Sequence, residues 1–196
     1  MGRFADLCIK HGCDKESVHR YGDAYDILLR PFKELHPLKI LEIGIYKGAS
    51  LTVFREYFPQ AKIWAIDIDL EPAIGKIPKS VEAIRGDQSD ADFLNRLATT
   101  YGNFDIIIDD GSHRVDHQRI SFGALWPFVS VGGIYVIEDL ESSISPRPKR
   151  NNPQGLETTL DMLLNMAKSH VHWRHCDKKP PMLSFFRELC CITKLE

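Results

Sequence analysis

Two pairs of neighbouring acidic residues stand where two apolar runs rich in Ile and Val end. The first pair is Asp109 and Asp110, and the second is Glu138 and Asp139. Four like charges brought together raise one another's pKa and destabilise the fold unless something neutralises them. An all-oxygen donor set with no Cys nearby favours a hard cation, Mg²⁺ or alternatively Mn²⁺ or Ca²⁺. The alternative is that these acids cap the helix and the loop that follow them.

A histidine stands three residues after the first acidic pair, at the start of the next predicted helix. The imidazole of His113 can therefore lie near a hydroxyl group bound to such a cation. A cation stabilises a developing alkoxide, and a neutral imidazole can accept the proton at neutral pH. The alternative is a surface histidine that caps a helix. We assign no role to His117, four residues further on.

A glycine turn follows the first predicted strand. It runs from Glu42 through Gly44 and Gly48 to Ser50, so its glycines have the spacing G-x-x-x-G. This spacing does not match the G-x-G-x-x-G of dinucleotide-binding turns, which argues against a nicotinamide-dependent dehydrogenase. Glycine lets a backbone pass close to a ligand where a Cβ would collide. Taken alone, the two glycines are equally typical of a tight strand-to-helix turn.

Polar residues also follow the second and third predicted strands. Asp67 and Asp69 lie about twenty residues after the glycine turn, where a carboxylate can accept hydrogen bonds from ribose hydroxyls. The third strand ends at Asp87, Gln88 and Ser89, a polar edge suited to an adenine ring. Because ligands of open α/β sheets bind at the carboxyl ends of the strands, this order predicts a nucleoside-containing ligand.

The elements that must position these residues are short strands alternating with amphipathic segments. Apolar runs without clean alternation predict strands that are buried on both faces, as in parallel sheets. We predict strands over residues 40–43, 63–66, 81–84, 104–108, 134–137, 171–174 and 189–192. Helical apolar spacing predicts helices over residues 50–58, 90–100, 117–128 and 156–167, with a further helix before the first strand.

This alternation predicts an α/β fold, a doubly wound and mostly parallel sheet of seven strands. We expect residues 1–196 to form a single domain, with an N-terminal helical segment over 1–36. The segment 141–155 is rich in Ser, Pro, Asn and basic residues, and we expect it to be a lid loop. Its Arg147, Lys149 and Arg150 are typical of a solvated loop, although they can also meet an anionic group of a substrate.

Composition narrows the functional class. Lys and Arg number 25 against 27 Asp and Glu, so the formal net charge is −2 and no broad nucleic-acid-binding surface is implied. No apolar run is long enough for a membrane helix, and residues 1–12 lack a signal-peptide core. Five Cys in irregular positions favour reduced thiols and a cytoplasmic protein. The spacing of His170, His172, His175 and Cys176 resembles half of a zinc site. The alternation of side chains along a predicted strand explains this spacing better, because no second pair of ligands has zinc-finger spacing.

The glycine turn with Asp67 and Asp87 resembles class I S-adenosylmethionine-dependent methyltransferases. The stretches 109–113 and 132–140 are similar to those of the macrolide sugar O-methyltransferases, the family of the mycinamicin and demethylmacrocin enzymes. Residues 14–25 and 158–160 also resemble segments of that family. The resemblance runs from about residue 12 to the end of the chain.

The resemblance implies a role for each of the residues above. S-adenosylmethionine would bind at the glycine turn and the polar strand ends, Mg²⁺ at one acid of the first pair and both of the second, and one histidine would be the general base. The implied cofactor-binding residues are Glu42, Gly44, Gly48, Ser50, Asp67, Asp69, Asp87, Gln88, Ser89 and Asp109. The implied metal ligands are Asp110, Glu138 and Asp139, and the implied base is His113.

We therefore predict a Mg²⁺-dependent O-methyltransferase that acts on a hydroxyl of a sugar or another vicinal-diol small molecule. Two adjacent oxygens can chelate the cation, which orients the attacking one. A catechol, a phenol or an amine as acceptor, and a non-catalytic S-adenosylmethionine-binding module, remain alternatives. We expect neither nucleic acid nor membrane as a partner, and the sequence leaves a homo-oligomer open.

Overall fold

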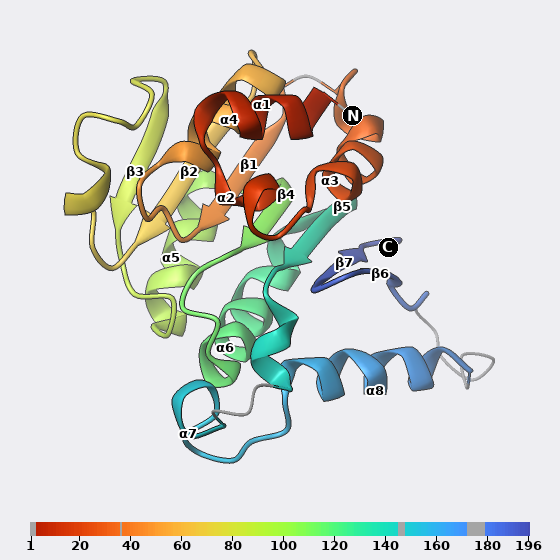
Figure 1. The fold of residues 1–196 in the computed structure, drawn as a ribbon. Coiled ribbons are helices and arrows are strands. Elements are labelled where there is room, and N and C mark those ends of the chain that lie inside the picture. The colour runs from red at the N-terminus through yellow and green to blue at the C-terminus, as the bar shows by residue number, and fades with distance from the viewer. Residues whose placement is uncertain (1–2, 36, 145–147, 172–178) are drawn as a thin grey trace. The chain divides into compact units, whose positions relative to one another are not determined.

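The computed structural model describes residues 3–35, 37–144, 148–171 and 179–196 (Figure 1). Contacts divide the chain into two compact units, Met1–Asp87 and Gln88–Glu196. Each unit carries its own set of parallel strands and is described by itself. Among the described residues, no helix has the length and apolar character that crossing a membrane requires.

Three parallel strands form the sheet of the first unit, in the order β3–β2–β1. They are β1 (Lys39–Ile43), β2 (Lys62–Asp67) and β3 (Val81–Arg85). The helix α4 (Ala49–Tyr57) connects β1 to β2, whereas a single 3₁₀ turn, η2 (Glu71–Ala73), lies between β2 and β3. The runs of Ile and Leu in β1 and β2 are buried, as expected for strands covered on both faces.

The N-terminal segment contains more helices than the single one we expected. It forms α1 (Arg3–His11), α2 (Asp14–Ser17), α3 (Gly22–Leu29) and the 3₁₀ turn η1 (Arg30–Phe32). The backbone breaks at Gly12 and Arg20, which both have positive φ angles, 64° and 57°. Figure 1 shows α1 beside α4, and these two helices are in contact. The ring centroid of Phe4 in α1 lies 5.3 Å from that of Phe54 in α4, and Phe4 also stacks on Tyr25 of α3 at 4.7 Å.

Two parallel strands and an antiparallel hairpin form the sheet of the second unit. The parallel pair is β4 (Phe104–Asp109) and β5 (Val129–Ile137). β7 (Leu189–Thr193) pairs antiparallel with β5, and β6 (Met182–Phe186) pairs antiparallel with β7. The helices α5 (Ala91–Tyr101) and α6 (Val115–Leu125), the latter followed by η3 (Trp126–Phe128), pack against each other. The ends of β4 and β5 thus lie side by side, as the acidic pairs require.

The segment predicted to be a lid loop contains short helices where it is described. A 3₁₀ turn, η4 (Leu140–Ser143), follows β5, and α7 (Pro148–Asn151) lies further along. The helix α8 (Thr159–Val171) begins later and ends later than predicted. The strand predicted over residues 171–174 lies outside the described residues, except that Val171 ends α8. β6 is not among the predicted strands, and the role of 141–155 as a lid stays a prediction.

Cys190 and Cys191 lie in β7 and are almost wholly buried, at 0% and 1% exposure. Burial raises the pKa of each thiol to about 12. They therefore serve as small apolar side chains of the core.

Candidate active site

The glycine turn adopts the left-handed conformation at both of its glycines. The φ angles are 95° at Gly44 and 79° at Gly48. A Cβ placed on Gly48 would meet its nearest neighbour, a side-chain atom of Ile77, at an ordinary 3.6 Å. Within the protein it is therefore the backbone conformation, rather than lack of space, that requires glycine at this position.

Asp67 holds this turn in place. Its Oδ2 accepts hydrogen bonds from the backbone amides of Ile45 (2.7 Å) and Tyr46 (3.1 Å). Its Oδ1 accepts from the amide of Asp69 at 3.0 Å, and the Asp69 side chain in turn accepts from the amide of Glu71. The residue predicted to bind ribose thus fixes the shape of the glycine turn, a role that the sequence did not predict.

Glu42 is fully buried at the end of β1 and lies next to a buried cation. Its Oε1 is 3.5 Å from Nζ of Lys15, and the two side chains are 0% and 1% exposed. Its Oε2 accepts a hydrogen bond from the Ser50 hydroxyl at 3.0 Å. Glu42 and Ser50, both predicted to bind the cofactor, are thus hydrogen-bonded to each other. The ion pair between Lys15 and Glu42 connects α2 of the N-terminal segment to the residue that precedes the glycine turn.

The polar residues after β3 divide between the two units. Asp87 closes the first unit, while Gln88 and Ser89 open the second. Asp87 and Ser89 are half-buried. Gln88 is 7% exposed; its Nε2 donates to Asp109 at 2.5 Å and its Oε1 accepts from the amide of Ser112 at 3.0 Å. Both ends of this amide therefore hold the loop that carries the first acidic pair.

Asp109 is fully buried and accepts three hydrogen bonds. The donors are Gln88, the Ser121 hydroxyl at 2.5 Å and the Tyr135 hydroxyl at 3.0 Å. Burial raises the pKa of the Asp109 carboxyl to about 6, although the hydrogen bonds and the nearby His113 oppose this rise. In this unit Asp109 faces the interior, so its predicted contact with the cofactor stays a prediction.

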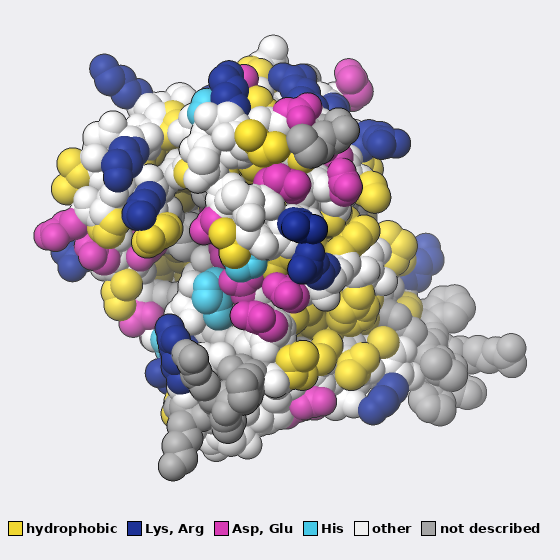
Figure 2. Space-filling model, in the orientation of Figure 1, with side chains coloured by type: hydrophobic (Ala, Val, Ile, Leu, Met, Phe, Trp, Pro, Cys, Tyr) yellow, Lys and Arg dark blue, Asp and Glu magenta, His cyan; other side chains and the backbone are white. Residues whose placement is uncertain are grey.

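The other acid of the first pair takes part in a cluster with metal-ligand character. One donor atom each of Asp110, His113 and Asp139 lie within 4.8 Å of one another. His113 Nε2 is 3.4 Å from Asp139 Oδ2, and the two side chains are 34% and 15% exposed. Figure 2 likewise shows acidic and histidine side chains together at the surface. The two carboxylates, at the ends of neighbouring strands, fit a hard divalent cation with positions left for a ligand, and the imidazole lies beside them.

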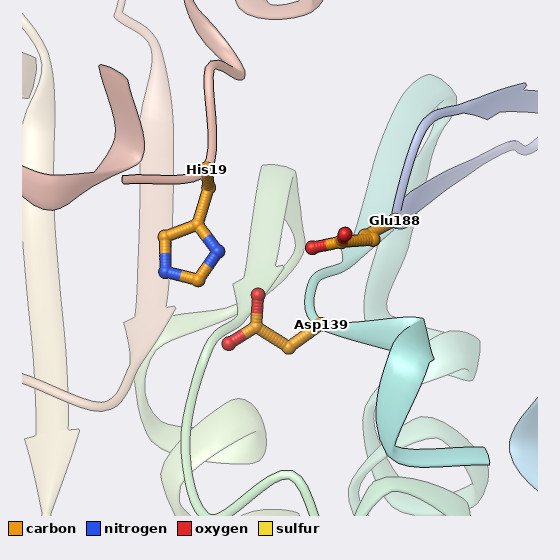
Figure 3. Close-up of side chains that lie close together, drawn as sticks. All are labelled: His19, Asp139 and Glu188. Atoms are coloured by element: carbon orange, nitrogen blue, oxygen red, sulfur yellow. The ribbon is translucent and has the colours of Figure 1, made fainter. Parts of the chain in front are cut away.

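Two glutamates flank this cluster. Glu138, predicted as a ligand, is 1% exposed and is not among the atoms grouped within 4.8 Å, so its role as a ligand stays a prediction. Glu188, in the turn between β6 and β7, has a carboxylate oxygen within 4.8 Å of Asp139. Figure 3 shows the side chains of Asp139 and Glu188 beside each other. No motif marks Glu188, because only the hairpin brings it to β5.

Both His113 and Asp139 have a left-handed backbone, which is uncommon for residues other than glycine. Their φ angles are 55° and 54°. Asp and His tolerate this region better than most residues, yet the conformation persists only where the surroundings fix it. The Nδ1 atom of His113 is buried without a hydrogen-bond partner. The imidazole therefore presents Nε2, the atom nearer Asp139, to the cluster.

Most of the remaining sequence candidates lie where the structure gives no description. His172, His175, Cys176 and Arg147 lie outside the described residues, as do the side chains of His170 and Lys149. Arg150 is exposed. His117 accepts or donates a hydrogen bond with the Ser112 hydroxyl at 2.8 Å.

Comparison with known proteins decides the family. A family model described as a methyltransferase domain matches residues 41–140, about half of the chain. The chain belongs to the S-adenosylmethionine-dependent methyltransferase family. Its curated relatives include the mycinamicin VI 2''-O-methyltransferase of Micromonospora griseorubida, 40% identical over 66% of this chain and 33% of the relative. The demethylmacrocin O-methyltransferase of Streptomyces fradiae is 38% identical over 80% of this chain and 41% of the relative.

Solved structures confirm the fold class. The methyltransferase MycE of the mycinamycin pathway, in complex with Mg and SAH, superposes with a TM-score of 0.84 at 31% identity. The match covers 98% of this chain and 54% of MycE. The seven-stranded, mostly parallel methyltransferase fold and the resemblance to macrolide sugar O-methyltransferases, both predicted from the sequence, are thus confirmed. The chain spans about half the length of MycE and less than half of the curated relatives it matches.

Proposed function

We propose that this chain is a Mg²⁺-dependent O-methyltransferase that transfers the methyl group of S-adenosylmethionine to a hydroxyl of a sugar or another vicinal diol. The observation that carries the proposal is the cluster of Asp110, His113 and Asp139, with donor atoms within 4.8 Å of one another. The names of the relatives support it, since these proteins methylate sugar hydroxyls of antibiotics. MycE was also solved with Mg, SAH and mycinamycin VI.

The first unit would hold the methyl donor. Gly44 and Gly48 leave the backbone of the turn open to a ligand, and Asp67 fixes that turn through its Oδ2. The carboxylate of Asp67 retains one lone pair, on Oδ1, beyond those used by the three backbone amides, so it can also accept from a ribose hydroxyl. Because the sulfonium donor is itself reactive, the protein needs no covalent intermediate.

The second unit would hold the acceptor. Asp110 and Asp139, with Glu138 as the further predicted ligand, would bind the cation. When bound, Mg²⁺ supplies positive charge that stabilises a developing alkoxide and orients two adjacent hydroxyls. His113 would accept the hydroxyl proton at Nε2, and Asp139, 3.4 Å away, would stabilise the imidazolium that forms.

A turnover screen tests the proposal. S-adenosylmethionine is offered with glycosides that carry vicinal diols, with catechols and with amines, each in Mg²⁺ and in EDTA. We expect methylation of a diol in Mg²⁺ only. Turnover of an amine that EDTA leaves intact would refute the metal mechanism, and donor binding without turnover of any acceptor would favour a binding module.

Matched variants sharpen this screen. Asp139→Asn should raise the Mg²⁺ concentration needed for half-maximal turnover. Asp92→Asn makes the same change on the exposed face of α5 and should leave the Mg²⁺ titration unchanged. An identical titration for both variants would exclude Asp139 as a ligand.

A further inference from the structure

The backbone of Asp139 is held in a conformation that an isolated aspartate rarely adopts. Its φ and ψ angles are 54° and 44°, in the left-handed region. Such a conformation persists only where neighbouring groups fix the peptide planes on both sides of the residue. The direction of the Asp139 carboxylate, and hence its place in the cluster, depends on those two planes.

Both planes are fixed by hydrogen bonds from other elements. The carbonyl of Glu138, in the peptide before Asp139, accepts from Nε2 of Gln118 at 3.2 Å. The amide of Leu140, in the peptide after Asp139, donates to the carbonyl of Glu188 at 2.8 Å. The helix α6 therefore holds one side of Asp139, and the turn between β6 and β7 holds the other.

Gln118 is itself oriented by a second buried hydrogen bond. Its Oε1 accepts from the hydroxyl of Thr159, the first residue of α8, at 2.7 Å. Both side chains are 0% exposed. Because the side-chain oxygen of Gln118 accepts from the hydroxyl of Thr159, the NH₂ group of Gln118 must face the carbonyl of Glu138. Neither residue has a carboxylate or imidazole side chain, so sequence motifs for metal ligands could not reveal them.

We propose that Gln118, oriented by Thr159, is a positioning residue that sets the backbone of Asp139 and thereby the affinity of the carboxylate cluster for a divalent cation. The part of this inference that concerns the cation rests on the proposed function. The part that concerns the backbone does not. Partners of this kind, one shell outside a metal, typically change metal affinity by about 10- to 100-fold when they are removed.

The first test measures cation binding without turnover. Mn²⁺ serves as the probe, and its dissociation constant is measured by electron paramagnetic resonance on the whole chain. Gln118→Met removes both hydrogen bonds at similar volume and should raise this constant at least about tenfold. Thr159→Val keeps Gln118 but frees its amide, and should raise the constant by about fivefold. Gln60→Met, the same change at an exposed position, should have no effect.

The second test needs no cation. In EDTA, amide hydrogen exchange at Leu140 should be about tenfold faster in Gln118→Met than in the wild type, because the peptide planes around Asp139 lose one anchor. Unchanged exchange at Leu140 together with an unchanged Mn²⁺ constant would overturn the proposal, even if the variant melts at a lower temperature. If the wild type binds no Mn²⁺ but Leu140 exchanges faster in the variant, the positioning role stands and the proposed function fails.

Discussion

Ionisation of the buried Asp109 carboxyl should make the protein less stable as the pH rises from 4 to 7. The pKa of this carboxyl rises from 3.8 to about 6 in the folded protein because the group is removed from water. Below pH 3.8, both the folded and the unfolded states carry the proton. Between 3.8 and about 6 the unfolded state loses it and the folded state keeps it, so the free energy of unfolding falls as the pH rises.

The size of this effect follows from the two pKa values. At about 1.4 kcal/mol for each pKa unit, the loss amounts to about 3 kcal/mol once the pH exceeds 6. Asp109→Asn removes the ionisation. The hydroxyls of Ser121 and Tyr135, which donate to Asp109, can rotate and accept from the new amide. The variant should therefore be more stable than the wild type by up to about 3 kcal/mol at pH 7 and should gain nothing at pH 4.

Urea unfolding of both proteins in EDTA, at intervals from pH 4 to 7.5, measures this difference. Taking the difference between the two curves cancels the titration of the groups that do not interact with Asp109. A difference that stays constant across the pH range, or that favours the wild type more as the pH rises, would refute the reasoning about Asp109.

Three further predictions concern single side chains. His113→Ala should lower kcat by about 10²- to 10⁴-fold while calorimetry finds donor affinity unchanged, and loss of donor binding would contradict its role as base. Asp67→Ala should weaken S-adenosylmethionine binding more than acceptor binding, since the variant would lose the proposed ribose partner together with the anchor of the glycine turn; equal losses of donor and acceptor binding would count against the ribose role. Cys190 and Cys191, with pKa values raised to about 12, should resist iodoacetamide at pH 7.5 until the protein unfolds, and mass spectrometry of native protein would detect any earlier labelling.

The strands of both units were predictable because buried parallel strands leave a strong composition signal. Runs of Ile and Val mark β1, β2, β4 and the second half of β5, and each lies where the sequence placed it. β6 was missed because it is half-exposed and carries no such run. The N-terminal helices were predicted as one because nothing in the sequence marks Arg20 as a break, although its φ angle is positive.

The side chains of the site that follow strand ends could be predicted from the sequence. Those that reach the site through long-range packing could not. Asp110, His113 and Asp139 come together because β4 and β5 are parallel neighbours. Glu188 and Gln118 were missed, since one reaches the site through a hairpin and the other through hydrogen bonds to a backbone carbonyl. Neither kind of contact leaves a spacing that a single sequence reveals.

The most direct measurement is anomalous diffraction from a crystal of this protein soaked in Mn²⁺. We expect an anomalous peak bonded to carboxylate oxygens of Asp110 and Asp139, with His113 beside it. Ordered water at that place, with no anomalous peak and the two carboxylates turned away from each other, would contradict the claim that these side chains form a cation site.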